Sequence, residues 1–127
     1  MQIGATFSHR QLHCMGHDVW TALNTFIDLG FRWIRLGCYW DEIEPTLGVY
    51  DFLHLNELME TCNDLGLKVV LTAGMKAPRW PEYYLPAYLN QNNYGKDYDF
   101  DLKDVILVDH LKKFLISCVN QFKGYKT

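Results

Sequence analysis

Apolar residues recur with helical spacing in three separate stretches of this 127-residue chain, at positions 18–29, 53–65 and near 104–122. An apolar run that reads as a strand precedes each of the first two stretches, at 2–8 and 31–37, and a third such run occupies 67–73. The chain therefore predicts three successive units of strand followed by helix. This order is typical of a parallel sheet covered by helices.

Two of the predicted strands follow the same short sequence. DLGFRWIRL at residues 28–36 aligns with DLGLKVVLT at residues 64–72. Gly30 and Gly66 stand just past a helix end, where a left-handed backbone favours glycine. We therefore expect a tight return from helix to strand at both positions. Gly124 has the same place after the last helix, so a fourth strand is expected to begin there.

Three parallel strands leave both sheet edges unpaired. We expect Phe7, Trp33 and Val69 to lie on the inner face of this open sheet, where their side chains contact water. A complete (β/α)₈ barrel has typically about 250 residues. We therefore predict an α/β fold in which residues 1–127 form the N-terminal portion of one TIM-barrel domain, with about three βα units. The alternative is a complete flavodoxin-like domain, although such sheets usually have about five strands.

Charge and cysteine usage narrow the classes of partner. The net charge is −3 and the basic residues are scattered, which argues against a nucleic-acid partner. No apolar run approaches the roughly 18 residues of a membrane helix. The cysteines show no CxxC spacing and no leader precedes the first strand, so we expect free thiols and a cytoplasmic protein.

Candidate chemistry is expected in the loops that follow the strands, because the active face of βα barrels lies there. Alternation along 31–37 places Arg35 with Trp33 on one face and the apolar pair Ile34 and Leu36 on the other. The apolar pair suits the helix layer, so Arg35 points inward. A buried guanidinium is costly unless a carboxylate meets it, so Arg35 predicts an acidic partner outside this chain.

Three segments then carry a family resemblance: IGATFS, DLGFRWIRLGCYWDEIEPTLGVYDF and GLKVVLTAGMKAPRWP. In this order they resemble the N-terminal half of the clan A glycoside hydrolases, which are retaining (β/α)₈ enzymes that include family 42 β-galactosidases, family 5 cellulases and family 35 relatives. The most specific piece is the Trp-x-x-Ile-Glu-Pro…Gly-x-Tyr-Asp-Phe signature at 40–52, which follows Arg35. The resemblance implies hydrolysis of O-glycosyl bonds in carbohydrate metabolism, a glycoside or polysaccharide substrate and no cofactor. It does not decide the family within the clan.

The resemblance also implies where the catalytic groups lie. In clan A the acid/base Glu follows an Asn at the end of the fourth strand, and the nucleophile Glu ends the seventh strand. Both positions would lie beyond Thr127, in the missing C-terminal half of the barrel, so the chain alone is predicted to be inactive. Arg35 matches the second-strand arginine that contacts the nucleophile.

The acidic loop at 39–52 invites a catalytic interpretation, because Glu42 and Glu44 on an extended segment would point the same way. Two neighbours on one exposed loop share their surroundings, however, whereas the mechanism needs pKa values that are pushed apart. We therefore expect Glu44 with Pro45 to shape the loop, and Asp51 to cap the following helix. Asp41 and Glu42 are expected to be solvated.

Sugar sites combine flat aromatic rings with hydrogen-bonding groups at their edges. The candidate substrate contacts are Trp40, Trp80, Tyr39, His9, Arg79 and Glu82. For the rings the alternative is an anchor packed on the barrel rim. For Arg79 and Glu82 the alternative is a mutual ion pair.

Two other functions stay open. A half-barrel could bind carbohydrate or a complementary chain without catalysis, and a small redox or metal-dependent domain is the third hypothesis. His9, His13 and His17 recur every four residues near Cys14 and Cys38, which would suit zinc if the loop were helical. The spacing has neither a finger nor an HExxH form, so we predict no metal.

Overall fold

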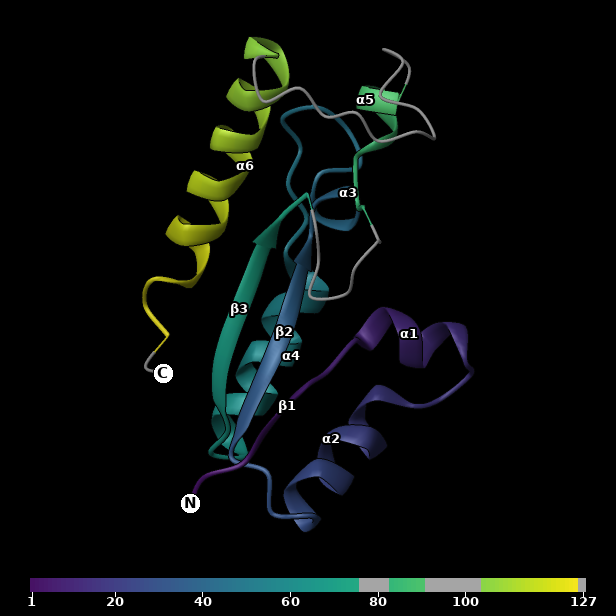
Figure 1. Cartoon of the computed structure of the whole chain (residues 1–127), viewed down its shortest axis with the longest axis vertical. Coiled ribbons are helices and arrows are strands. Elements are labelled where there is room, and N and C mark those ends of the chain that lie inside the picture. The colour runs from purple at the N-terminus through teal and green to yellow at the C-terminus, as the bar shows by residue number, and fades with distance from the viewer. Residues whose placement is uncertain (76–82, 91–103, 126–127) are drawn as a thin grey trace. The chain divides into compact units, whose positions relative to one another are not determined.

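The computed structural model describes residues 1–75, 83–90 and 104–125. The elements run in the order β1 (Gly4–Thr6), α1 (His9–Cys14), α2 (Val19–Asp28), β2 (Trp33–Tyr39), α3 (Trp40–Ile43), α4 (Leu53–Asp64), β3 (Lys68–Gly74), α5 (Ala87–Asn90) and α6 (Val105–Phe122) (Figure 1). The three strands form one sheet in the order β1-β2-β3, and β1 is parallel to β2. The predicted α/β class of a partial barrel is confirmed.

The helix-to-strand returns have the predicted conformation. Gly30 has φ +87° and Gly66 has φ +69°, so both occupy the left-handed region. At the first return the Phe31 amide donates to the Phe26 carbonyl, and at the second the Leu67 amide donates to the Cys62 carbonyl. The repeated sequence therefore produces the same hydrogen-bonded end of helix twice.

The chain divides into two compact units. Unit 1 contains Met1–Gly37, Leu53–Thr72 and Lys126–Thr127, and unit 2 contains Cys38–Phe52 and Ala73–Tyr125. The core of unit 1 includes Leu23 of α2, Ile34 and Leu36 of β2, and the buried face of α4. In unit 2 the fully buried rings of Trp40 and Phe114 stack with centroids 5.3 Å apart.

The strand register corrects two expectations about the open face of the sheet. Thr6 pairs with Arg35, so Phe7, one residue further along, points to the opposite side, where its ring meets Phe26 of α2 edge-on at 5.4 Å. The placement of Phe7 on the open face is therefore wrong. Val69 is also wrong, because it is buried whereas Val70 is 47% exposed.

Glycine is required at one point of the sheet. A Cβ atom on Gly4 would lie 2.7 Å from the Cβ of Trp33, the residue paired with it on β2.

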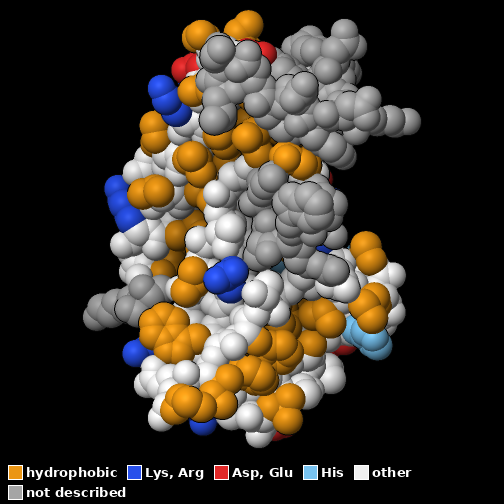
Figure 2. All heavy atoms as spheres, in the orientation of Figure 1, with side chains coloured by type: hydrophobic (Ala, Val, Ile, Leu, Met, Phe, Trp, Pro, Cys, Tyr) orange, Lys and Arg blue, Asp and Glu red, His pale blue; other side chains and the backbone are white. Residues whose placement is uncertain are grey.

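Hydrophobic side chains reach the molecular surface on the face shown in Figure 2. Within the ranges that the structure describes, no helix combines the length and apolarity needed to cross a membrane.

Candidate functional site

Arg35 lies on the open face of the sheet in unit 1. Alternation along β2 leaves Ile34 and Leu36 buried and Arg35 exposed, which confirms the predicted facing of these side chains. The guanidinium is exposed because three strands leave that face of the sheet uncovered. Within residues 1–75, 83–90 and 104–125, no carboxylate makes an ion pair with Arg35, so its acidic partner stays a prediction.

A shallow pocket of about 200 Å³ lies beside Arg35. It is lined by Gly4, Ala5, Thr6, Trp33, Ile34, Arg35 and Val70. The Trp33 ring is held from two directions, since its Nε1 donates to Gln2 Oε1 at 2.7 Å and the Lys68 ammonium lies 5.1 Å from the ring centroid. The pocket therefore joins an exposed cation to a positioned aromatic ring.

Glu44 in unit 2 is almost fully buried, at 2% exposed. Its Oε2 accepts from Trp40 Nε1 at 2.7 Å and its Oε1 accepts from the Gly48 amide at 2.8 Å. Gly48 has φ +75°, and the same turn is closed by the Asp51 amide, which donates to the Ile43 carbonyl at 2.7 Å. The predicted loop-shaping role of Glu44 is confirmed.

The pKa values of two tyrosines near Glu44 are raised. Burial raises the pKa of Tyr88, and the negative charge of Glu44 raises it further. Burial is also the first cause of the raised pKa of Tyr50, where a hydrogen bond from Ser117 acts in the opposite direction. Both phenols therefore remain neutral at physiological pH.

The other acidic residues of this loop differ from expectation. Residues 40–43 form the short helix α3, so the extended geometry that would have paired Glu42 with Glu44 is absent from this part of the described chain. Asp41 and Glu42 are half-buried rather than fully exposed. Both lie in the first turn of α3, where backbone amides favour negative charge.

The candidate aromatic platforms Trp40 and Tyr39 are both buried. The Trp40 ring stacks on Phe114, and the Tyr39 ring lies 4.6 Å from that of Tyr84. Their burial against other rings favours the anchor alternative over direct contact with a sugar. Trp80, Arg79 and Glu82 lie outside the described residues.

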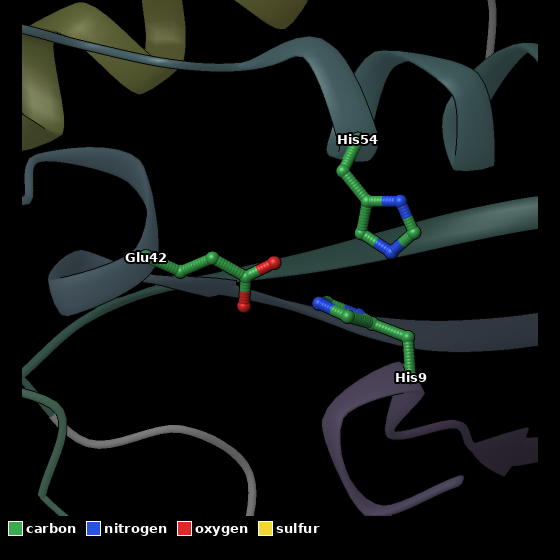
Figure 3. Close-up of side chains that lie close together, drawn as sticks. All are labelled: His9, Glu42 and His54. Atoms are coloured by element: carbon green, nitrogen blue, oxygen red, sulfur yellow. The ribbon is translucent and has the colours of Figure 1, made fainter. Parts of the chain in front are cut away.

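His9 begins α1 and is buried, and its ring centroid lies 5.0 Å from that of His54 in α4 (Figure 3). His13 and His17 are exposed, and in the described part of unit 1 they do not gather with His9 at ligand distance. Sequence reasoning missed His54. The helix that follows a strand starts at the end of the sheet where the strand finishes, which was the available signal.

All four cysteines are free thiols, as predicted. In unit 2 the buried Sγ atoms of Cys38 and Cys118 lie 3.2 Å apart. Contact with Cys118 and then burial raise the pKa of Cys38, and burial alone raises the pKa of Cys62 to about 11. These thiols are therefore protonated packing groups.

The chain has parallel βα units, an arginine on the open face of the sheet and the signature loop at the end of β2. These features are those of one segment of a (β/α)₈ glycosidase barrel. The chain belongs to glycoside hydrolase family 42, whose family model, described as β-galactosidase, matches residues 13–112. The β-galactosidase BgaH of Haloferax lucentense is 34% identical over 62 residues, which cover 47% of this chain and 9% of BgaH.

Solved structures show the same fold. The chain is similar to the exo-β-1,4-mannosidase Op5Man5 from Opitutaceae bacterium strain TAV5, with TM-score 0.70 and 18% identity, and to a β-galactosidase from the psychrophilic Marinomonas ef1, with TM-score 0.73 and 16% identity. The match covers 98% of this chain, but 23% of the mannosidase and 20% of the β-galactosidase. The chain thus spans about a fifth of the length of these structures.

Proposed function

We propose that this chain is the N-terminal portion of a retaining O-glycoside hydrolase that acts on β-glycosides in the manner of a β-galactosidase. The observation that carries the proposal is membership of family 42. The similarity to BgaH, a β-galactosidase, supports a galactoside substrate. The proposed partners are a glycoside or oligosaccharide and the remainder of the barrel.

The chemistry of the proposed reaction needs a pair of carboxyl groups that are free to act. Retaining hydrolysis uses two carboxyl groups about 5 Å apart, of which one acts as nucleophile and the other as acid and base. Both oxygens of Glu44 already accept hydrogen bonds within their own loop, so this carboxylate is held as a structural acceptor. We propose, from the resemblance to clan A alone, that both catalytic Glu residues lie beyond Thr127, and we expect the isolated chain to be inactive.

Arg35 is proposed to support the nucleophile. A guanidinium presents a planar fork of donors that matches a carboxylate, and on the open face of β2 the Arg35 group makes no ion pair within the described residues. A carboxylate brought beside it by later strands would have its pKa lowered and would remain ionised as a nucleophile must. Arg35 is thus a positioning residue.

The alternative is a non-catalytic half-barrel that binds carbohydrate or a complementary chain. The shallow pocket beside Arg35 favours it, because Trp33 and a cation lie at its wall. The same open face would also suit a second chain that completes the barrel.

The coding sequence that follows residue 127 separates the two proposals. The hydrolase requires a strand that ends in Asn-Glu within about 15 residues, as expected for the next βα unit of a barrel. The protein translated through that region should hydrolyse nitrophenyl β-galactoside, and Arg35→Ala should lower its kcat/KM at least about 100-fold, as loss of electrostatic support does. A longer protein without the Asn-Glu strand, or without turnover of any nitrophenyl β-glycoside, would contradict the hydrolase proposal.

A further inference from the structure

Two histidines from different helices of unit 1 face each other. His9 is the first residue of α1 and His54 is the second residue of α4. Their ring planes meet at 70°, and the nitrogen atoms that can serve as ligands lie within 4.8 Å of one another. Figure 3 shows one ring nitrogen of His54 pointing toward the His9 ring. Glu42, the third side chain labelled there, belongs to unit 2.

The other nitrogen of His54 has a carboxylate neighbour. His54 Nδ1 lies 4.0 Å from Glu57 Oε2, one turn further along α4. Histidines that ligate metals generally direct their second ring N–H to a carboxylate or carbonyl, which fixes the tautomer and makes the free nitrogen a better ligand. At 4.0 Å Glu57 is a charged neighbour of Nδ1 rather than a hydrogen-bond acceptor, and Nε2 is the ring nitrogen left for the ion.

Burial differs between the two rings in a way that suits ion capture. His9 is 4% exposed and is held in a helix that Ser8 caps by accepting from the Gln11 amide, so its ring is fixed before any ion arrives. The His54 side chain is 46% exposed and is free to adjust. Zinc–imidazole bonds of about 2.0–2.1 Å require the two nitrogens to be roughly 3.3 Å apart, which a small rotation of the exposed ring can provide.

We propose that His9 and His54 chelate a late first-row divalent metal ion, of the class of Zn²⁺ and Cu²⁺, with water in the remaining positions. Neutral imidazole is the ligand these ions favour, and two rings from separate elements give a chelate that surface histidines lack. The ion would join the start of α1 to the start of α4. Hydrolase activity is no part of this inference.

Titration of the whole chain with ZnCl₂ or CuSO₄, followed by calorimetry, tests the site. We expect binding of one ion per chain, and at least a tenfold loss of affinity in His54→Gln and in His9→Gln. Glu57→Gln should weaken binding less than either histidine change, because Glu57 is only a charged neighbour of His54 and contributes no ligand atom. The matched controls His13→Gln and His17→Gln alter exposed histidines of the same segment and should retain the wild-type affinity.

Electron paramagnetic resonance of the Cu²⁺-loaded chain gives a second readout. Coupling to two ring nitrogens is expected in the wild type, and to one in His54→Gln. Because the His54 side chain is half exposed, its replacement should leave the chain folded, so a lost coupling would report the lost ligand. The proposal is overturned if the wild-type chain binds neither ion, if His54→Gln binds within twofold of wild type, or if His17→Gln loses as much affinity as His54→Gln.

Discussion

Arg35 and Glu44 lie nine positions apart in the sequence and in different units, and their surroundings are opposite. Glu44 is buried, and each of its oxygens accepts a hydrogen bond from its own loop. Arg35 is exposed on the open face of the sheet and has no ion pair within the described residues. Glu44, whose two oxygens both accept local hydrogen bonds, stabilises the fold. Arg35, which has no such partner within the described residues, is the better candidate for a role in catalysis.

The difference follows from where each side chain is attached. The Glu44 loop turns back on itself through α3 and Gly48, so its own donors surround the carboxylate. Arg35 belongs to a strand whose neighbours contribute Thr6 and Val70 to the same pocket, and neither is ionisable. A partner for Arg35 therefore has to come from outside these three strands.

Replacement of Glu44 by alanine should have the largest effect. It leaves Trp40 Nε1 and the Gly48 amide without their acceptor, and buried bonds to a charged group contribute about 1.5–3 kcal/mol each. We expect the free energy of unfolding in urea to fall by about 3 kcal/mol or more. Glu60→Ala, at an exposed position of α4, is the control and should change stability by less than about 0.5 kcal/mol. Equal small effects at both positions would contradict the structural role of Glu44.

Gly48→Ala should have an intermediate effect. No atom would lie within 4 Å of the added Cβ, so the cost comes only from the left-handed backbone at φ +75° and is about 1–2 kcal/mol in the same urea measurement. Gly124→Ala also meets no neighbour, and its φ lies outside the left-handed region, so it should leave stability nearly unchanged. A stability for Gly48→Ala equal to that of Gly124→Ala, with neither below the wild type, would contradict the left-handed turn described at Gly48.

Arg35→Ala should have the smallest effect on stability, about 0.5 kcal/mol or less, because the side chain is exposed and makes no ion pair with any residue that the structure describes. The urea midpoint of this variant should overlay that of the wild-type chain. A loss above 1 kcal/mol, on the order of one good hydrogen bond, would mean that Arg35 has a structural partner and would remove the contrast with Glu44.

The sequence predicted the repeated elements well, because each rests on a periodic pattern or a marked glycine. Gly30 and Gly66 predicted the two tight returns from helix to strand. The alternation of residue types along β2 predicted that Arg35 and Ile34 lie on opposite faces of the sheet. Helices α1 and α3 were missed, since one or two turns carry too few apolar positions to show a period. The side to which Phe7 points was predicted wrongly, because a slip of one residue in register reverses every side chain of a strand.

The contacts among functional candidates were harder to predict. Trp40 and Tyr39 were expected at the surface of the cleft, but their burial depends on Phe114 and Tyr84, which are distant in sequence. The proximity of His9 and His54 has the same origin, since it arises from packing of the first and second βα units. No spacing rule within one segment could have found either pair.

The most direct test of the central claim is steady-state hydrolysis of nitrophenyl β-galactoside by the isolated 127-residue chain at high protein concentration. We predict a rate equal to that of buffer, with wild-type, Glu42→Gln and Glu44→Gln chains indistinguishable. Turnover by the wild-type chain that is abolished by Glu42→Gln, in a variant that stays folded, would contradict the account, because the signature loop would then hold a catalytic carboxylate.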